Sequence, residues 1–175
     1  MTTAVSGNHL GMPLEIDPSD HENRAFFGYL ASGELRLQKC TSCGLLRYPP
    51  GTGCPFCGYP DAEWHAVDPR GTVYTYAEVH HAIQPAFRDH VPYLIVIVEL
   101  DTQSGQPGPN DGLRIAGNLV TADGELASPE LVRTVGIGTR VRMVFKAVGD
   151  DFALPMFAAD DTQSQLSAPW RYPGT

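Results

Sequence analysis

The pattern C-x-x-C-G occurs twice, as Cys40-Thr41-Ser42-Cys43-Gly44 and as Cys54-Pro55-Phe56-Cys57-Gly58, with ten residues between Cys43 and Cys54. These four cysteines are all that the chain has. Two short turns that each present two thiolates can surround one metal ion tetrahedrally. The spacing therefore predicts a metal site with the ligands Cys40, Cys43, Cys54 and Cys57.

Four thiolates fill a tetrahedral shell and leave no open position for a substrate, so the metal is expected to be structural. Zn2+ is the expected ion. A rubredoxin-type iron, which would make the chain an electron carrier, has the same sulfur geometry and stays open at this point. Two disulfides are the remaining reading, and they are disfavoured in a reducing compartment.

The residues around the cysteines predict a small ribbon over 35–68. Alternating segments lead into the first knuckle at 35–40, out of it at 45–50, and away from the second at 63–67. A glycine follows each cysteine pair, as a tight turn around sulfur requires. A ribbon of this size buries little core, so metal binding would supply most of its folding free energy.

The segment before the ribbon, 1–34, is expected to be a tail followed by one helix. Residues 1–16 are expected either to be poorly ordered or to lie against another surface. The helix is predicted from about Asp20 to Ser32, with a capping box formed by Ser19 and Glu22 and with Gly33 at its C-terminal cap. Phe26 and Phe27 on this helix are expected to pack in a core rather than to meet a ligand.

The region 69–158 is rich in β-branched and aromatic residues and carries no strong helical pattern. Five strands are predicted, at 72–80, 93–100, 113–120, 140–146 and 152–157. Five strands in about ninety residues favour a small closed barrel of the OB type. The fold class is therefore mainly β: an N-terminal helix, a rubredoxin-like zinc ribbon and a five-stranded OB-fold barrel.

The last part, 159–175, is a polar, Pro-rich tail that contains Trp170 and Tyr172. Aromatic residues in such a tail fit a docking segment. Simple disorder fits the composition equally well, and both readings stay open.

The net charge of the 175-residue chain is -8, which disfavours general nucleic-acid binding. The ribbon is different, because it carries Arg36, Lys39 and Arg47 and no acidic residue from 35 to 60. These cations either offset the anionic metal–thiolate centre or meet a phosphorylated ligand or an acidic partner. Single-strand binding by the barrel, through exposed Tyr74 and Tyr76, is a further alternative.

No catalytic residue is predicted. His80, His81 and His90 are the only clustered candidates, but neighbours at the end of a strand point to opposite faces. No apolar run is long enough to cross a membrane and no signal peptide is visible at the N-terminus, so a cytoplasmic location is expected.

The ordered features resemble the DUF35 family, over roughly residues 20–158. The matching stretches are Phe26-Phe27, Gly33-Glu34-Leu35, Lys39-Cys40-Thr41-Ser42-Cys43-Gly44, Tyr48-Pro49-Pro50, Cys54-Pro55-Phe56-Cys57-Gly58, Glu63-Trp64 and Gly71-Thr72-Val73-Tyr74-Thr75-Tyr76. The chain departs from the pattern at Phe27, where the family often has Trp, and in the long loop 102–112.

The resemblance implies an accessory subunit of a thiolase-fold enzyme that acts on acyl-CoA, in a heterotetramer or larger assembly. The partner would be a thiolase, a hydroxymethylglutaryl-CoA synthase, an acyltransferase or an aldolase of steroid side chains, and it would carry the catalytic groups. The subunit would help to form the acyl-CoA channel. Arg36, Lys39 or Arg47 would then lie near the phosphates of the coenzyme A thioester, and no nucleic acid or membrane would be bound.

Overall fold

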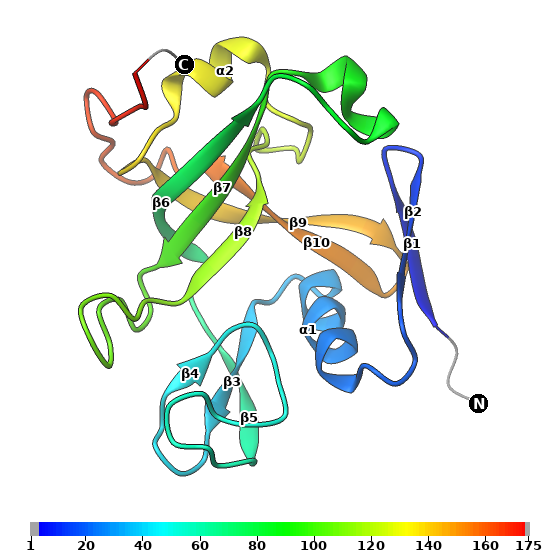
Figure 1. The fold of residues 1–175 in the computed structure, drawn as a ribbon, viewed down its shortest axis with the longest axis vertical. Helices are drawn as coiled ribbons and strands as arrows, with labels where there is room; N and C mark the ends of the chain where they lie inside the picture. The colour runs from blue at the N-terminus through cyan, green and yellow to red at the C-terminus, as the bar shows by residue number, and fades with distance from the viewer. Residues whose placement is uncertain (1–3, 174–175) are drawn as a thin grey trace. The chain divides into compact units, whose positions relative to one another are not determined.

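The computed structural model describes residues 4–173 (Figure 1). The elements in chain order are β1 (Val5–His9), β2 (Met12–Ile16), α1 (His21–Ala31), β3 (Arg36–Cys40), β4 (Leu46–Arg47), β5 (Ala62–Ala66), β6 (Arg70–Val79), the 3-10 helix η1 (Pro85–His90), β7 (Tyr93–Leu100), β8 (Arg114–Asn118), α2 (Pro129–Thr134), β9 (Arg140–Gly149) and β10 (Phe152–Ala159). None of the helices among these residues is both long and apolar enough to cross a membrane.

The chain divides into two compact units. The first contains the residues up to Asp68, the loop Thr102–Leu113 and the hairpin tip Ala147–Leu154. The second contains Pro69–Asp101, Arg114–Lys146 and the residues from Pro155 onward. The domain limits drawn from the sequence stay a prediction.

The N-terminal segment is not poorly ordered in its described part, because β1 and β2 form an antiparallel hairpin that lies against the tip of the β9–β10 hairpin. Its turn uses positive φ angles at Leu10 and Gly11. A Cβ at Gly7 would lie 2.7 Å from the carbonyl oxygen of Val148, so the missing side chain lets β1 approach the tip of the β9–β10 hairpin closely. Met12, Leu14 and Ile16 of β2 do alternate with Pro13 and Glu15, but β1 carries a single large apolar residue, Val5, and sequence reading missed the hairpin.

Helix α1 begins one residue later than the predicted capping box requires. Asp20 is the N-cap and accepts a hydrogen bond from the Asn23 amide (3.1 Å), whereas Ser19 donates to the carboxylate of Asp17. Ser19 and Asp20 both have side chains that can cap a helix, and the Asp20 carboxylate is the one that accepts the capping hydrogen bond. The C-terminal prediction is confirmed: Gly33 has φ +81°, and the Glu34 amide bonds to the Tyr29 carbonyl in a Schellman motif.

The predicted core role of the two phenylalanines of α1 is confirmed. Phe26 is buried and its ring lies 5.5 Å from that of Tyr48 at the exit of the first knuckle. Phe27 packs on Phe152 at 5.1 Å. The helix thereby joins the ribbon to the tip of the β9–β10 hairpin within the first unit.

The ribbon is a three-stranded sheet with the order β4-β3-β5. Its five-residue strands β3 and β5 are antiparallel, with Leu37 opposite His65 and Gln38 opposite Trp64. The buried apolar residues of this module are few: Leu35, Leu37, Leu46 and the two cysteines Cys40 and Cys54. So small a core leaves most of the stabilisation to the cysteine centre.

The five predicted barrel strands are confirmed as β6 to β10, in the sheet order β10-β9-β6-β7-β8. A parallel bridge between Leu119, just after β8, and Phe157 in β10 brings the two ends of the sheet together. That bridge closes the sheet into the barrel expected of an OB-fold. Its core is apolar, with fully buried side chains from all five strands: Val73, Leu94, Val96, Val98, Leu100, Ile115, Val141 and Phe157.

Two short helices, which the sequence analysis did not predict, lie between the barrel strands. Helix α2 has Ser128 as its N-cap and Pro129 at its first position, a strong local start signal in a six-residue helix. Its buried face amounts to Val132. One apolar residue gives no readable helical period, so the pattern was missed.

The C-terminal tail lies on the barrel of its own chain. Trp170 forms an isolated antiparallel bridge with Ile137, and the Tyr172 amide donates to the Tyr76 hydroxyl (2.9 Å). Of the two readings left open by the composition, docking is the one found, and the surface used belongs to the same chain.

Candidate metal centre

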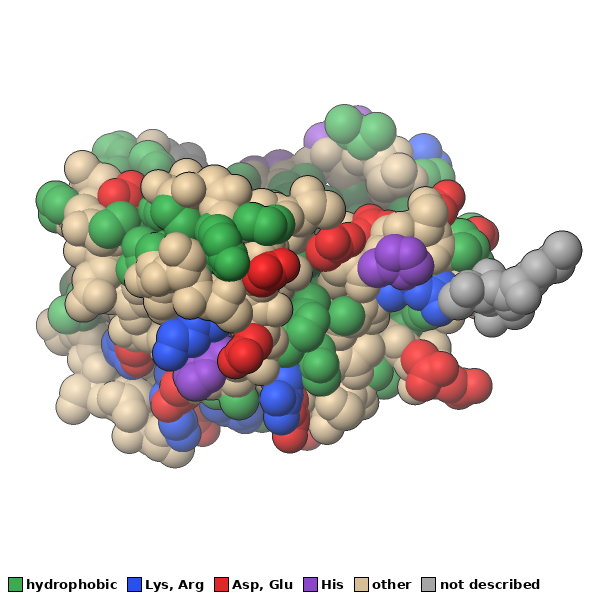
Figure 2. Space-filling view, turned by 90° about the horizontal axis from the view of Figure 1, so that it is seen from below, with side chains coloured by type: hydrophobic (Ala, Val, Ile, Leu, Met, Phe, Trp, Pro, Cys, Tyr) green, Lys and Arg blue, Asp and Glu red, His purple; other side chains and the backbone are tan. Residues whose placement is uncertain are grey.

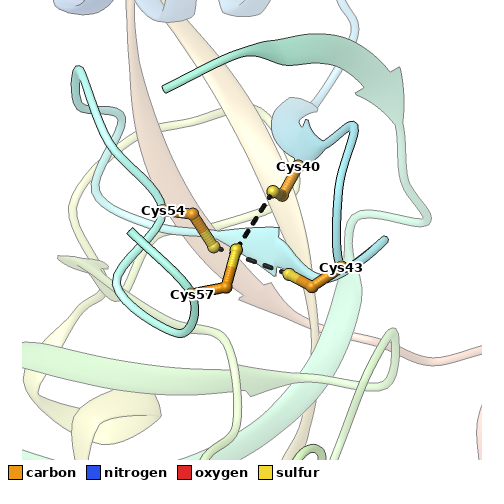
Figure 3. Close-up of side chains that lie close together, drawn as sticks. All are labelled: Cys40, Cys43, Cys54 and Cys57. Carbon is orange, nitrogen blue, oxygen red and sulfur yellow. Dashed lines mark hydrogen bonds between the residues drawn. The ribbon is translucent and has the colours of Figure 1, made fainter. Parts of the chain in front are cut away.

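The four cysteines converge at one end of the ribbon (Figure 3). Cys40 ends β3, Cys43 follows in the first knuckle, and Cys54 and Cys57 come from the second. The Sγ atoms of Cys40 and Cys57 are 3.7 Å apart and those of Cys43 and Cys54 are 3.6 Å apart. All four sulfur atoms lie within 4.8 Å of one another.

These distances fit a tetrahedral metal. Zn–S bonds of about 2.3 Å in a regular tetrahedron place neighbouring sulfurs about 3.8 Å apart. An S–S bond is far shorter, about 2.05 Å, so the cysteines are not paired as disulfides, and all four are free thiols in this structure. The donor set and its geometry therefore match one Zn2+ held by Cys40, Cys43, Cys54 and Cys57.

The two knuckles repeat the same backbone geometry. The Gly44 amide donates to the Cys40 carbonyl (3.0 Å), and the Gly58 amide donates to the Cys54 carbonyl (2.9 Å). Gly44 and Gly58 have φ angles of +76° and +75°, which a side chain would disfavour. The glycine at the end of each C-x-x-C-G pattern is thus explained by the turn that aims the sulfurs.

The thiols cannot all ionise without a cation. The backbone amide of Cys43 is the main cause that lowers the pKa of Cys40, to about 6. For Cys43 the amide of Leu45 acts in the same direction, but burial and the neighbouring thiols outweigh it and raise the pKa to about 12. Because negative charges this close repel one another, a divalent ion is needed to hold four thiolates together.

The three predicted cations of the ribbon do not gather at one place. Arg36 pairs with Glu34 (2.6 Å) and lies over the Tyr29 ring. Lys39 is exposed opposite Glu63 of β5. On the face seen in Figure 2, Lys and Arg side chains mix with Asp, Glu and His rather than forming one basic patch.

Arg47 is different, because only 3% of its surface is exposed. It donates to the Gln38 side chain (2.8 Å) and to the Gly51 carbonyl (2.7 Å). Gln38 also accepts from the Gly51 amide. Arg47 therefore cross-links the ribbon from inside.

The other candidates from the sequence belong to the second compact unit. His80 and His81 are exposed, and His80 contacts the Glu78 carboxylate at 3.3 Å. Tyr74 is exposed, with the Arg114 guanidinium 3.8 Å from its ring centre. The expectation that Tyr76 is exposed is wrong, because it is buried, with the Tyr172 ring of the C-terminal tail 5.4 Å from its own.

Sequence reading also missed how the loop 102–113 is attached. The Gln103 side chain accepts a hydrogen bond from the Leu46 amide (2.7 Å) and donates to the Leu46 carbonyl (2.9 Å), as a neighbouring strand would. This pair covers the outer edge of β4. A lone Gln in a glycine-rich loop gives no sequence signal for such a role.

These features define the class of protein: a closed, structural zinc ribbon joined to an OB-fold barrel. Two family models match the chain in that order. The model described as "ChsH2, rubredoxin-like zinc ribbon domain" covers residues 27–61, and "ChsH2, C-terminal OB-fold domain" covers residues 64–146.

A "DUF35 domain-containing scaffold protein" of Methanocaldococcus jannaschii is 32% identical over 114 residues, which are 65% of this chain and 68% of that protein. The chain belongs to the DUF35 family. A "Probable enoyl-CoA hydratase alpha subunit" of Thermomonospora curvata is 32% identical over 140 residues. That match covers 79% of this chain but only 37% of the relative.

Among solved structures, a chain of the "Ltp2-ChsH2(DUF35) aldolase" has a TM-score of 0.61 and 30% identity, and the match covers 79% of this chain and 94% of that one. A DUF35 protein of unknown function from Sulfolobus solfataricus has a TM-score of 0.51 at 15% identity, which supports the fold alone.

Proposed function

We propose that this chain is a non-catalytic, zinc-binding accessory subunit that pairs with a thiolase-fold enzyme acting on acyl-CoA. The proposal rests on the match to a chain of the "Ltp2-ChsH2(DUF35) aldolase", a name that joins a DUF35 protein to a second protein. The match extends over 94% of that chain. The relative named as a subunit of an enoyl-CoA hydratase adds support for a CoA thioester as the substrate of the complex.

The chemistry of the chain fits an accessory role. Four thiolates complete the coordination of a tetrahedral ion, so the cysteine centre offers no position at which a substrate could be activated. The candidate histidines His80 and His81 are exposed, and His90 is half-buried. The partner would therefore carry the catalytic groups, and this chain would stabilise it and help to form the acyl-CoA channel.

The proposed acyl-CoA contact lies on the ribbon and the first barrel strand, near the phosphates of CoA. Lys39 carries the exposed cation, while Arg36 is already held by Glu34. Because Arg47 is buried, it supports this surface from within. The assembly would be a heterotetramer or larger in the cytoplasm, with a steroid side-chain thioester as the favoured acyl group.

The first test is co-purification of the chain from its native host, identification of the bound protein by mass spectrometry, and reconstitution of the two proteins. The two proteins should co-elute as one complex, and acyl-CoA turnover should require both. A partner that is fully active alone and never co-elutes would contradict the proposal. Metal analysis of the same sample should give one zinc per chain in a colourless protein, whereas iron and a red colour would favour an electron carrier.

The second test addresses the CoA contact. Lys39→Glu should raise the KM for acyl-CoA of the reconstituted complex about tenfold, because a repelled phosphate loses about 1.4 kcal/mol of binding. Arg88→Glu in η1 makes the same charge change on another exposed residue and should leave KM unchanged. Equal KM values in the two variants would exclude Lys39 as a phosphate contact.

A further inference from the structure

We infer that residues 160–173 form a C-terminal strap that seals the part of β6 that β9 leaves unpaired. While the strap is seated, that strand edge cannot take up another strand, whether from a partner or from a second copy of this chain. The inference does not depend on the identity of the enzyme partner. It concerns a segment that lies beyond both matched family models.

The gap that the strap fills comes from the barrel itself. β9 pairs with β6 only at Arg70 to Thr72. Val73 still exchanges two backbone hydrogen bonds with residues 138 and 139, both 2.9 Å, and the register between β6 and β7 shifts at Val73 to Thr75. Beyond this point β6 continues to Val79, paired with β7 on its other side. Uncovered strand edges are sites of unwanted pairing, which folds generally avoid.

The strap lies beside the segment before β9, where Trp170 forms an antiparallel bridge with Ile137 (Figure 1). The Ile137 amide donates to the Trp170 carbonyl (2.8 Å), and the Trp170 amide donates to the Ile137 carbonyl (3.2 Å). On the β6 side, the Tyr172 amide bonds to the Tyr76 hydroxyl, and the Tyr172 hydroxyl lies 3.3 Å from that of Thr75. The strap thus contacts both walls of the gap.

Arg171 is the anchor between these two contacts. Its guanidinium donates to the Val132 carbonyl (2.7 Å) and to the Val135 carbonyl at the end of α2, and it pairs with the Glu78 carboxylate. Both charged side chains are largely buried, at 17% and 6% exposure. Removing Arg171 takes the guanidinium away from the buried Glu78 carboxylate, whose other partner is the exposed His80 (3.3 Å), so this anchor should dominate seating of the strap.

The seat is shaped for the strap by two glycines. A Cβ at Gly136 would lie 2.3 Å from the Trp170 carbonyl oxygen, and one at Gly138, where φ is +91°, would lie 2.6 Å from the Leu166 side chain. A backbone cannot give way as a flexible side chain can. Gly136 therefore serves close approach of the strap, whereas Gly138 is favoured by its positive φ, since the end of the Leu166 side chain could move aside.

Hydrogen exchange on the zinc-loaded full chain tests the inference. In the unaltered chain the amides of Ile137 and Trp170 should be protected. Arg171→Ala should accelerate their exchange at least about tenfold and should also accelerate the amides of residues 74–79, as expected for local opening. Amides of β7, such as that of Val96, should not change. The matched control is Arg133→Ala, an exposed arginine on α2, which should leave all of these rates unchanged.

Three results would overturn the inference. One is free exchange of the Ile137 and Trp170 amides in the unaltered chain. Another is equal exchange in Arg171→Ala and Arg133→Ala, and the third is release of the strap without any change at 74–79. If Arg171→Ala fails to fold, Tyr76→Phe removes only the acceptor of the Tyr172 amide, and the same measurement on that variant decides.

Discussion

The ribbon and the barrel of this chain are stabilised by different means. The ribbon has a three-stranded sheet whose buried apolar residues include two of the metal ligands themselves. The barrel closes through a parallel bridge and fills its interior with leucine, valine, isoleucine and phenylalanine. The ribbon is therefore held by coordination, and the barrel is held by apolar burial.

This difference bears on function. A coordinated ribbon presents a rigid surface from few residues, because the ion replaces the core that a larger module would need. The barrel carries its own core and also seats the C-terminal strap. The ribbon should consequently unfold when its metal is lost, and the barrel should unfold when its apolar core is disrupted, each without the other.

The largest expected effect is loss of the metal. Cys43→Ser removes one thiolate, and structural zinc contributes about 10–16 kcal/mol to the folding of zinc-finger peptides. The variant should lose zinc to EDTA, and the ribbon amides of β3 should exchange freely, while those of β7 stay protected. Ser42→Ala in the same knuckle should keep one zinc per chain. Full zinc retention by Cys43→Ser would show that the Cys43 sulfur is not a ligand.

The complementary change lies in the barrel core. Phe157→Ala leaves a cavity beside the closing bridge, and such truncations cost about 3–5 kcal/mol. Denaturant unfolding followed by circular dichroism should show that loss, with zinc content unchanged before unfolding. Phe56→Ala on the exposed second knuckle should change stability by less than about 0.5 kcal/mol. If zinc is lost at the denaturant concentration at which the barrel unfolds, the ribbon and the barrel do not unfold independently.

A smaller effect is expected where loop 102–113 is attached to the ribbon. Gln103→Ala leaves the Leu46 amide and carbonyl without their partner and should cost about 1–3 kcal/mol of local stability. Faster exchange of the Leu46 amide at constant zinc content measures this effect. Gln106→Ala, an exposed change in the same loop, is the control. Unchanged exchange in Gln103→Ala would mean that the loop does not hold β4.

The smallest effect is a pH dependence of the barrel. A hydrogen bond from Thr162 is the main cause that lowers the pKa of the buried Asp160 carboxyl, and Arg70 adds to it. A lowered folded-state pKa stabilises the fold above the unfolded value of about 3.9, and this stabilisation is lost as the pH falls through the folded value. Thr162→Val should therefore unfold at a higher pH in an acid titration than the unaltered chain. Ser164→Ala, a nearby change, should leave the pH of unfolding unchanged. If the unaltered chain and both variants unfold at the same pH, Asp160 is not the cause of the pH dependence.

Much of the fold followed from local patterns. The two C-x-x-C-G knuckles predicted the ligands, since the turn, the glycine and the thiols lie within a few residues of one another. The five strands followed from β-branched composition and alternation. The helix end at Gly33 was also readable, because a single residue at positive φ terminates the helix.

Other features could not be read from local sequence. The choice of Asp20 over Ser19 as the cap, the burial of Arg47 and Tyr76, and the seat of Trp170 each depend on contacts with residues distant in the chain or on a close competition between neighbours. The position of the β1–β2 hairpin is of this kind too, because it lies against Val148 and Gly149, which are distant in the chain.

The amino-acid order settled the metal ligands, the order of helix, ribbon and barrel, and the acidic balance of the chain, because these properties arise from neighbouring residues and from composition. The three-dimensional fold settled which charges and aromatic rings are accessible: Lys39 is exposed while Arg47 is buried, and Tyr74 is exposed while Tyr76 is covered. The reason is physical. Accessibility is set by which distant segments pack against a residue, and only the closed barrel and its strap bring those segments together.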